Sequence, residues 1–327
     1  MTNLTDKQQA ALDSMFRFIN PKVELGTKIG EIIAEFNVGN IPTGTPVNAV
    51  NAGETLSISD VVVDGETVVI NDVDVYEFLA DDEQTKTTES NIAVDITSYV
   101  TKSAEDLTVD TQPTSGDTMT VGEGDGEKVY TFVPDGTANA EGEISVGTDL
   151  ASAQANIVAA INGTDGVNTA HTQVSAGEFA ANVSAITAKI GGVIGDSIAT
   201  TETFTAGTNV FGGATLSGGA DCSAANAVTA LVSAITAEDT QGVGAADGAG
   251  DTVDLTADIA GVIGNSITIS ETMANASFGA ATLENGVDGT VGVEGEVMSD
   301  DTYLYRAIAE NTTADKNWRR ISLGAAY

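Results

Sequence analysis

Two stretches sixty-nine residues apart repeat one pattern of glycine and β-branched residues, and this repeat restricts the chain to folds built from related modules. Residues 190–202 read IGGVIGDSIATTE, and residues 259–271 read IAGVIGNSITISE. A second match follows, because FGGATL at 211–216 is answered by FGAATL at 278–283. Self-similarity at a fixed spacing is typical of repeat architectures. The sequence therefore predicts a tandem of at least two related units.

A second repeated pattern lies upstream and has the period of β-strands. Asp64-Gly65 stands between two β-branched runs, which is a strong local signal for a β-hairpin. DGE at 64–66 with Tyr76-x-Phe78 resembles DGE at 125–127 with Tyr130-x-Phe132. We expect a hairpin unit to open both the first and the second module.

Two short amphipathic helices are expected after these strands. The first is capped at Thr148 or Asp149 and ends at Asn162-Gly163, since glycine readily adopts the left-handed conformation that terminates a helix. The second contains Val228, Leu231, Val232 and Ile235 at helical spacing. The predicted fold is α+β and β-rich: tandem small modules of β-hairpins or sheet with one short helix each, an N-terminal helical arm and a β-rich C-terminal motif.

These patterns suggest five segments. They are an N-terminal helical docking arm (1–45), a first β-hairpin module (46–118), a second α+β module (119–220), a third α+β module that repeats the second (221–290), and a C-terminal aromatic and basic β motif (291–327).

Both ends of the chain are candidate interfaces. Near the N-terminus, Phe16 and Phe36 belong to two amphipathic patterns interrupted by proline. These patterns form either a small helical hairpin packed on its own domain or a docking arm for a neighbouring subunit. The C-terminal motif gathers aromatic and basic residues that are typical of contact surfaces: Tyr303, Tyr305, Trp318, Arg319 and Arg320.

The charge distribution separates these ends from the body of the chain. The formal net charge is −36, and residues 29–305 hold four basic and forty-three acidic residues. Nucleic acids and anionic membranes require a basic surface, so we expect neither as a partner. A long apolar run that would span a membrane, about 18 residues or more, is not found in the sequence. We expect a soluble protein whose charge confers solubility, keeps copies apart, or does both.

The residues needed for most catalytic sites are missing. The chain contains one histidine, His171, and one cysteine, Cys222, so nucleophile–base pairs and metal sites of several His or Cys ligands are excluded. We interpret His171 as a loop residue and Cys222 as a core or boundary residue. We expect no catalytic residue, no cofactor and no metal.

Two features resemble ligand sites but fit simpler interpretations. The glycines at 191–195 lack the lysine of a phosphate loop, and a repeated tight turn explains them better. The acidic pairs Asp72/Asp74 and Asp81/Asp82, the latter followed by Glu83, lack the spacing of a calcium loop. They are expected to be solvated loops, although calcium binding remains an alternative.

Several segments together resemble structural proteins of tailed-bacteriophage virions. They are the DGETVVI and DGEKVYTF hairpins, the LASAQANIVAAINGTDG helix, the IGGVIGDSI and FGGATLSGGAD segments, and the ending YLYRAIAENTTADKNWRRISLGAAY. The resemblance covers residues 55–327 and is closest to head decoration, or cement, proteins and to fibre proteins. The first forty residues carry no such resemblance.

The resemblance implies a non-enzymatic protein of the capsid exterior, made in the host cytoplasm. Its implied partners are the major capsid protein or other virion proteins, and further copies of the chain itself, with a trimer as the implied oligomer. A tail fibre or tail tube subunit is the alternative expectation, and a glycan-binding adhesin is a further one.

Overall fold

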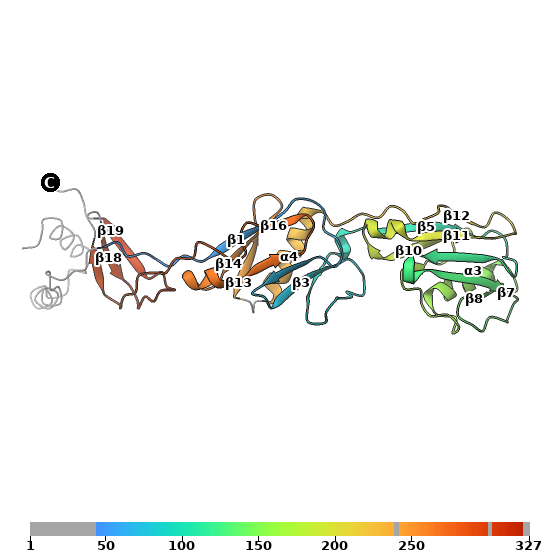
Figure 1. Ribbon diagram of the computed structural model, residues 1–327, viewed down its shortest axis with the longest axis horizontal. Coiled ribbons are helices and arrows are strands. Elements are labelled where there is room, and N and C mark those ends of the chain that lie inside the picture. The colour runs from blue at the N-terminus through green and yellow to red at the C-terminus, as the bar shows by residue number, and fades with distance from the viewer. Residues whose placement is uncertain (1–43, 239–241, 300–302, 323–327) are drawn as a thin grey trace, which may run out of the picture.

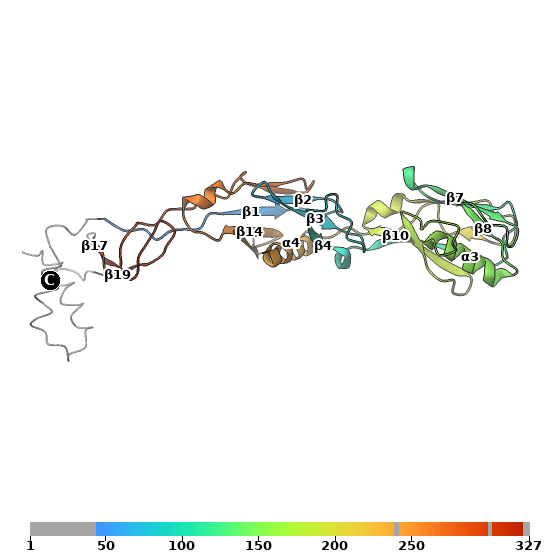
Figure 2. The same cartoon turned by 90° about the horizontal axis from the view of Figure 1, so that it is seen from below.

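The structure, a computed structural model, describes residues 44–238, 242–299 and 303–322, and these form three units in an elongated row. Figures 1 and 2 show the row from two directions, with a small sheet at one end and two larger modules beyond it. The described chain is β-rich and carries two α-helices, which confirms the expected α+β class. The predicted N-terminal arm, with Phe16 and Phe36, lies outside the described residues.

Module 1 is the middle unit and is built from two distant parts of the chain, residues 51–96 and 222–285. The first part contributes β1 (Gly53–Ile58), β2 (Thr67–Ile70), β3 (Asp74–Leu79) and β4 (Ile92–Asp95). The second contributes α4 (Ala224–Glu238), β13 (Val243–Asp247), β14 (Thr252–Ala257), the 3₁₀ turn η4 (Val262–Ser266), β15 (Ile269–Glu271) and β16 (Ala276–Phe278). The strands form two sheets, ordered β13-β14-β1-β16 and β15-β2-β3-β4.

Module 2 is the outer unit and comprises residues 101–220. Its elements are β5 (Lys102–Thr108), β6 (Thr118–Gly122), η2 (Gly124–Gly126), β7 (Lys128–Val133), β8 (Glu143–Ser145), α3 (Leu150–Asn162), β9 (Val174–Ala176), β10 (Val183–Gly191), η3 (Val193–Ser197), β11 (Ala199–Glu202) and β12 (Val210–Phe211). Its sheets are ordered β12-β5-β10-β9 and β11-β6-β7-β8.

The two modules have the same topology. Each strand of module 1 has a counterpart in module 2 at the same place in its sheet, and β3–β4 and β7–β8 are the two parallel pairs. The agreement extends to single residues: Leu56 pairs with Phe278 in one module, and Leu107 pairs with Phe211 in the other. The chain therefore uses one fold twice.

The copies are nested rather than consecutive. In module 2, residues 146–149 connect β8 to α3, whereas in module 1 the equivalent connection from β4 to α4 contains all of module 2. The predicted separate modules 46–118 and 221–290 are two parts of one domain, and strand β5, placed in the first of them, belongs to module 2. The physical reason is strand pairing, because β1 lies between β14 and β16, which come from the far side of the insertion.

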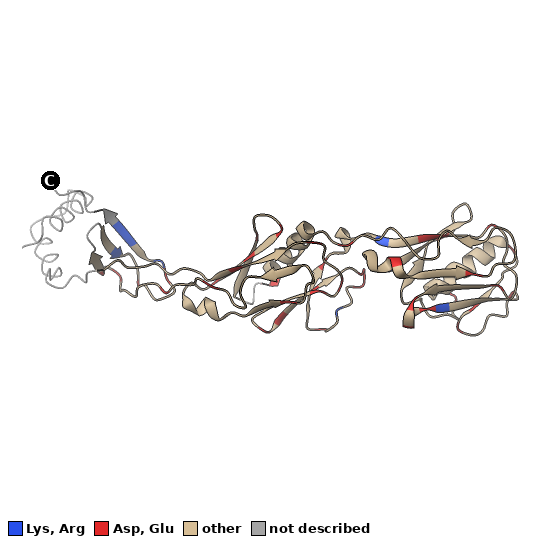
Figure 3. Cartoon of the chain, turned by 45° about the horizontal axis from the view of Figure 1, so that its top comes forward, with Lys and Arg blue, Asp and Glu red and all other residues tan. Residues whose placement is uncertain are grey.

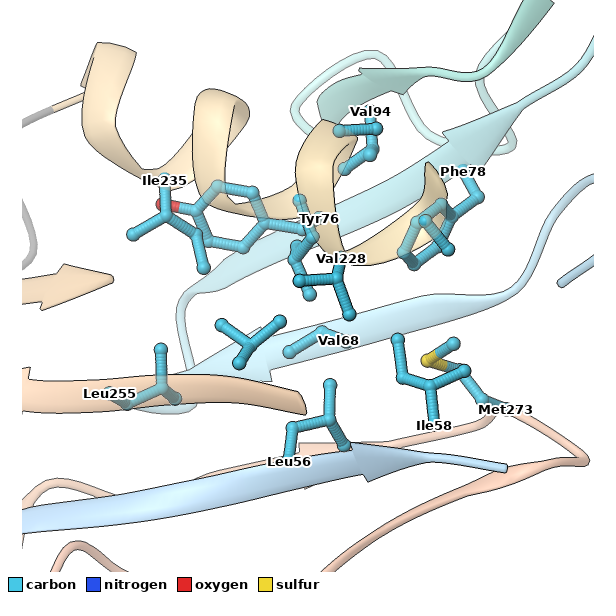
Figure 4. Packing of buried hydrophobic residues seen from close by; sticks show 14 of the residues in the cluster. Leu56, Ile58, Val68, Tyr76, Phe78, Val94, Val228, Ile235, Leu255 and Met273 are labelled. Carbon is cyan, nitrogen blue, oxygen red and sulfur yellow. The ribbon is translucent and has the colours of Figure 1, made fainter. Parts of the chain in front are cut away.

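Each module buries one apolar core between its two sheets and its helix. In module 1, Leu56 and Leu255 come from one sheet, Tyr76 from the other, and Val228 and Ile235 from α4. Figure 4 shows the helix side chains pointing down onto the sheet residues. Neither half of module 1 could bury its apolar face alone, since layers of secondary structure need a partner layer.

Local sequence explains the boundaries of α3. Asp149 caps the helix by accepting a hydrogen bond from the Ser152 backbone N–H, and the Ser152 hydroxyl lies close to the Asp149 N–H in return. Gly163 ends the helix with φ 67°, as expected from the Asn162-Gly163 pair. The second predicted helix is also confirmed, as α4.

The prediction of a hairpin at Asp64-Gly65 is wrong. The strands on either side of it, β1 and β2, belong to different sheets, so this turn connects two layers. Its polar groups are used locally: Asp64 accepts a hydrogen bond from the Ala80 N–H at 2.7 Å. The hairpin of module 1 lies instead between β2 and β3, at Asn71 and Asp72, which both have positive φ. The hairpin predicted around residues 125–127 does join two paired strands, β6 and β7.

Two antiparallel connectors join the modules. The outgoing connector contains η1 (Thr97–Tyr99), and its Thr101 forms a β-bridge with Ala220 of the returning connector. Two further contacts hold the joint: the Gly191 N–H donates to the Ala80 carbonyl at 3.0 Å, and Lys102 forms an ion pair with Asp82 at 2.7 Å.

Candidate interaction surface

The terminal unit, made of residues 44–49 and 289–322, gathers the predicted C-terminal interface residues into one small sheet. Its strands are β17 (Val297–Ser299), β18 (Tyr303–Ala307) and β19 (Trp318–Ser322), in that order. Within the β-rich motif expected at the end of the chain, β18 pairs with β19 in antiparallel fashion. The described chain also starts here, because the Gly44 N–H donates to the Ser299 carbonyl at 2.9 Å.

Trp318 and Tyr305 form the core of this unit. They are 3% and 5% exposed, and they pack with Ala307. The Trp318 indole N–H donates to the Thr290 carbonyl at 2.7 Å, so the polar edge of the ring is also satisfied. Trp318 and Tyr305, which were predicted as interface residues, are therefore core residues of this unit.

Arginine side chains are exposed on the surface of the terminal unit. Arg320 lies over the Tyr303 ring, 4.5 Å from its centroid, which is a favourable cation–π distance. Arg306 and Arg319 stand directly opposite each other on β18 and β19, and like charges in this arrangement repel. Arg306 lies on the middle strand, β18, and Arg319 and Arg320 lie on the edge strand, β19, so Figure 3 shows blue on two strands of this sheet.

Within the described ranges these arginines have no carboxylate partner. The ion pairs found there are Lys102–Asp82 and Lys128–Glu141, both in module 2 or at its joint. A groove of about 500 Å³ lies beside the sheet, and Thr45, Pro46, Trp318, Arg319 and Arg320 contribute to its lining. The groove combines positive charge with aromatic surface, which suits a carboxylate-bearing protein surface.

The repeated glycine turns serve the fold itself. Gly192 and Gly261 start η3 and η4 with φ of 104° and 113°, a region that favours glycine. The next N–H in each turn, that of Val193 or Val262, donates at 2.8 Å to a carboxylate in the segment that follows the module, Asp221 or Asp288. A protein carboxylate already accepts the hydrogen bond from the backbone N–H of each turn. The glycines are therefore part of a repeated tight turn, as the sequence predicted.

The lone histidine and cysteine are both buried. Cys222 is fully buried in the core of module 1, as expected, and burial raises the pKa of its thiol to about 11. His171 lies in a loop but is only 1% exposed, and burial lowers its pKa. Its Nε2 lies 3.0 Å from the Val121 carbonyl, and its Nδ1 accepts from the backbone N–H of Gln173, which identifies the neutral Nε2–H tautomer.

The acidic loop at 81–83 is occupied by internal contacts. Asp81 accepts hydrogen bonds from the Thr85 N–H, and Asp82 pairs with Lys102. Sequence analysis missed the residue that organises this loop: buried Glu77 accepts from the Thr87 N–H and from the Asn91 amide. An acidic residue between the two core residues of β3, Tyr76 and Phe78, was the available signal.

Asp72 lies in the turn of the hairpin between β2 and β3, and Asp74 is the first residue of β3. A cluster of three or more His, Cys, Asp or Glu side chains suited to a metal was not found in the described residues. Nor does any helix in the same residues have the length and apolar character required to span a membrane.

Comparisons with protein-family models, with curated proteins and with solved structures each find no match to this chain.

Proposed function

We propose that the protein is a non-enzymatic structural protein of a bacteriophage virion that decorates the exterior of the capsid, as a cement protein or short head fibre. The observation that carries the proposal is the arrangement of the row. The described chain starts and ends in the terminal unit, while module 2 lies at the opposite end. A body of this kind is suited to attachment at one end and projection at the other.

The charge pattern supports the same orientation. The terminal unit presents Arg306, Arg319 and Arg320 on exposed positions, whereas the modules carry most of the acidic residues. An acidic body repels neighbouring acidic bodies and favours solubility, and the arginine cluster of the terminal unit is attracted to carboxylates on a protein shell. The proposed partners are therefore the major capsid protein, or another virion protein, and further copies of this chain.

The proposal is tested by co-sedimentation of the purified full-length protein with bacteriophage heads that lack decoration and, separately, with isolated tails. Binding to heads supports decoration, and binding to tails alone would assign the protein to a tail fibre instead. Binding to neither, across a set of particles from different phages, would overturn the virion assignment.

A matched pair of variants tests which end attaches. Arg320→Glu places a negative charge in the terminal unit, and Lys189→Glu makes the same charge change in module 2. Because a like charge in an interface costs several kcal/mol, we expect Arg320→Glu to weaken binding at least about tenfold. Lys189→Glu should bind as the unchanged protein does, and equal losses in both variants would contradict attachment through the terminal unit.

A further inference from the structure

The thin segment between module 1 and the terminal unit exposes apolar side chains that it cannot bury itself. This neck consists of residues 47–50, 259–263 and 286–293, and it therefore includes the start of the η4 turn of module 1 and the adjoining edge of the terminal unit. Figures 1 and 2 both show it as a narrow part of the row, where a few extended stretches of chain run between thicker units. Val47, Val50, Val287, Val291 and Val293 are each 44–65% exposed along its two extended segments.

The η4 turn adds to the same surface. Ile259, Val262 and Ile263 are 52–63% exposed, and the Gly261 N–H donates to the Val50 carbonyl, which fixes this turn against the extended segments. The described residues include sixteen exposed large hydrophobic side chains, and eight of them lie in the neck. Such a concentration is typical of a surface that another protein covers.

The backbone of the neck explains why these side chains stay exposed. Val50 forms a β-bridge with Val287, and Val47 exchanges hydrogen bonds with Thr290, so the two extended segments lie side by side. No further layer of described residues covers the five valines enough to bury them. Two paired segments cannot enclose apolar side chains on their own.

The neck is also poor in charged residues compared with the rest of this acidic chain. Its residues include one carboxylate, Asp288, and that group accepts a hydrogen bond from the Val262 N–H. The whole chain has a net charge of −36 from 48 acidic residues. The electrostatic repulsion between two copies in close lateral contact is lowest where the contacting segments are apolar and carry little charge.

We propose that the neck is the surface through which copies of this chain associate side by side. Extended, β-branched segments with little charge can be self-complementary, as a symmetric homo-oligomer requires. This inference deepens the proposed function, because copies attached at their terminal units would bring their necks together. The negative charge of modules 1 and 2 would then keep these modules of neighbouring copies apart.

The test is the mass of the full-length protein in solution, measured by light scattering on a sizing column. We expect an oligomer for the unchanged protein and a monomer for the double variant Ile263→Asp/Val291→Asp. Both positions are 63% exposed, so the substitutions should leave the fold intact, which circular dichroism checks.

The matched control is Ile194→Asp. Ile194 occupies the equivalent position of the η3 turn and is 60% exposed, but it lies in module 2. We expect this variant to remain oligomeric. A monomeric unchanged protein, an oligomeric double variant, or dissociation of the control to the same extent would each overturn the inference.

A third measurement separates self-association from coverage by the first 43 residues of the same chain. If those residues cover the neck, the full-length protein is monomeric and a chain that begins at Gly44 associates, which would contradict the proposal. These mass measurements use the purified protein without phage particles, so they do not depend on the proposed function. A protein that associates through its neck yet binds no head or tail would therefore refute the proposed function alone.

Discussion

Replacing Tyr130 by phenylalanine should stabilise module 2. Tyr130 and its counterpart Tyr76 are both fully buried, and neither hydroxyl has a hydrogen-bond partner within the described structure. In module 1, Figure 4 shows the Tyr76 hydroxyl beside the apolar Ile235. Burial raises the pKa of both phenols far above the usual range, which is the expected sign of hydroxyls held away from water.

The magnitude follows from the cost of burying an unpaired polar group. Leaving a buried hydroxyl unsatisfied costs about 1–3 kcal/mol, and phenylalanine removes that cost while it keeps the ring in place. The lost oxygen contacts are worth about 0.1–0.2 kcal/mol each, so a net gain of about 1 kcal/mol is expected. For a module of this size the gain corresponds to a rise in melting temperature of about 4 °C.

Differential scanning calorimetry of the full-length protein measures this rise. Ser103→Ala provides the contrast in the same module, because the buried Ser103 hydroxyl donates to Asp196 at 2.7 Å. Its loss should lower stability by about 1–2 kcal/mol. A Tyr130→Phe variant that melts at a lower temperature than the unchanged protein would refute the reasoning, since the hydroxyl would then have a partner.

Three further predictions concern the modules. Replacing residues 97–221 by the four-residue loop 146–149 of module 2 should leave a folded module 1, measured as a single cooperative unfolding transition. Acidification from about pH 7 to pH 5.5 should destabilise module 2, because the unfolded chain binds a proton at His171 near its ordinary pKa of about 6.5 while buried His171 resists protonation. His171→Gln should flatten this dependence of the melting temperature on pH. Asp221→Ala and Asp288→Ala should each cost about 1–2 kcal/mol in denaturant unfolding, because each carboxylate accepts an equivalent hydrogen bond in its η turn.

Short-range features of the fold were predictable because their causes are local. The capping residue Asp149 and the terminating Gly163 define α3 within a few positions. The glycines of the η turns and the Tyr-x-Phe pairs repeat because each copy of the fold needs them at the same place.

The nesting was missed because no local pattern records that β1 pairs with β14 across an inserted domain. The order of the repeats did contain a signal. Both Tyr-x-Phe strands precede both helices, which is the order expected for one copy inserted within another.

At the candidate surface, the sequence did not indicate the direction of each side chain. Trp318 points into the small core, while its neighbours Arg319 and Arg320 are exposed. The exposed valines of the neck could not be recognised in advance, because β-branched residues in an extended segment are more often buried in a sheet.

The paired connectors between the modules determine how the row responds to a pull. A load applied to module 2 reaches the terminal unit through two covalent chains in parallel, one near Thr101 and one near Ala220. Each chain then carries about half of the tension that a single linker would carry. A protease that cuts one connector leaves module 2 tethered by the other, so two separate breaks are required to release the tip.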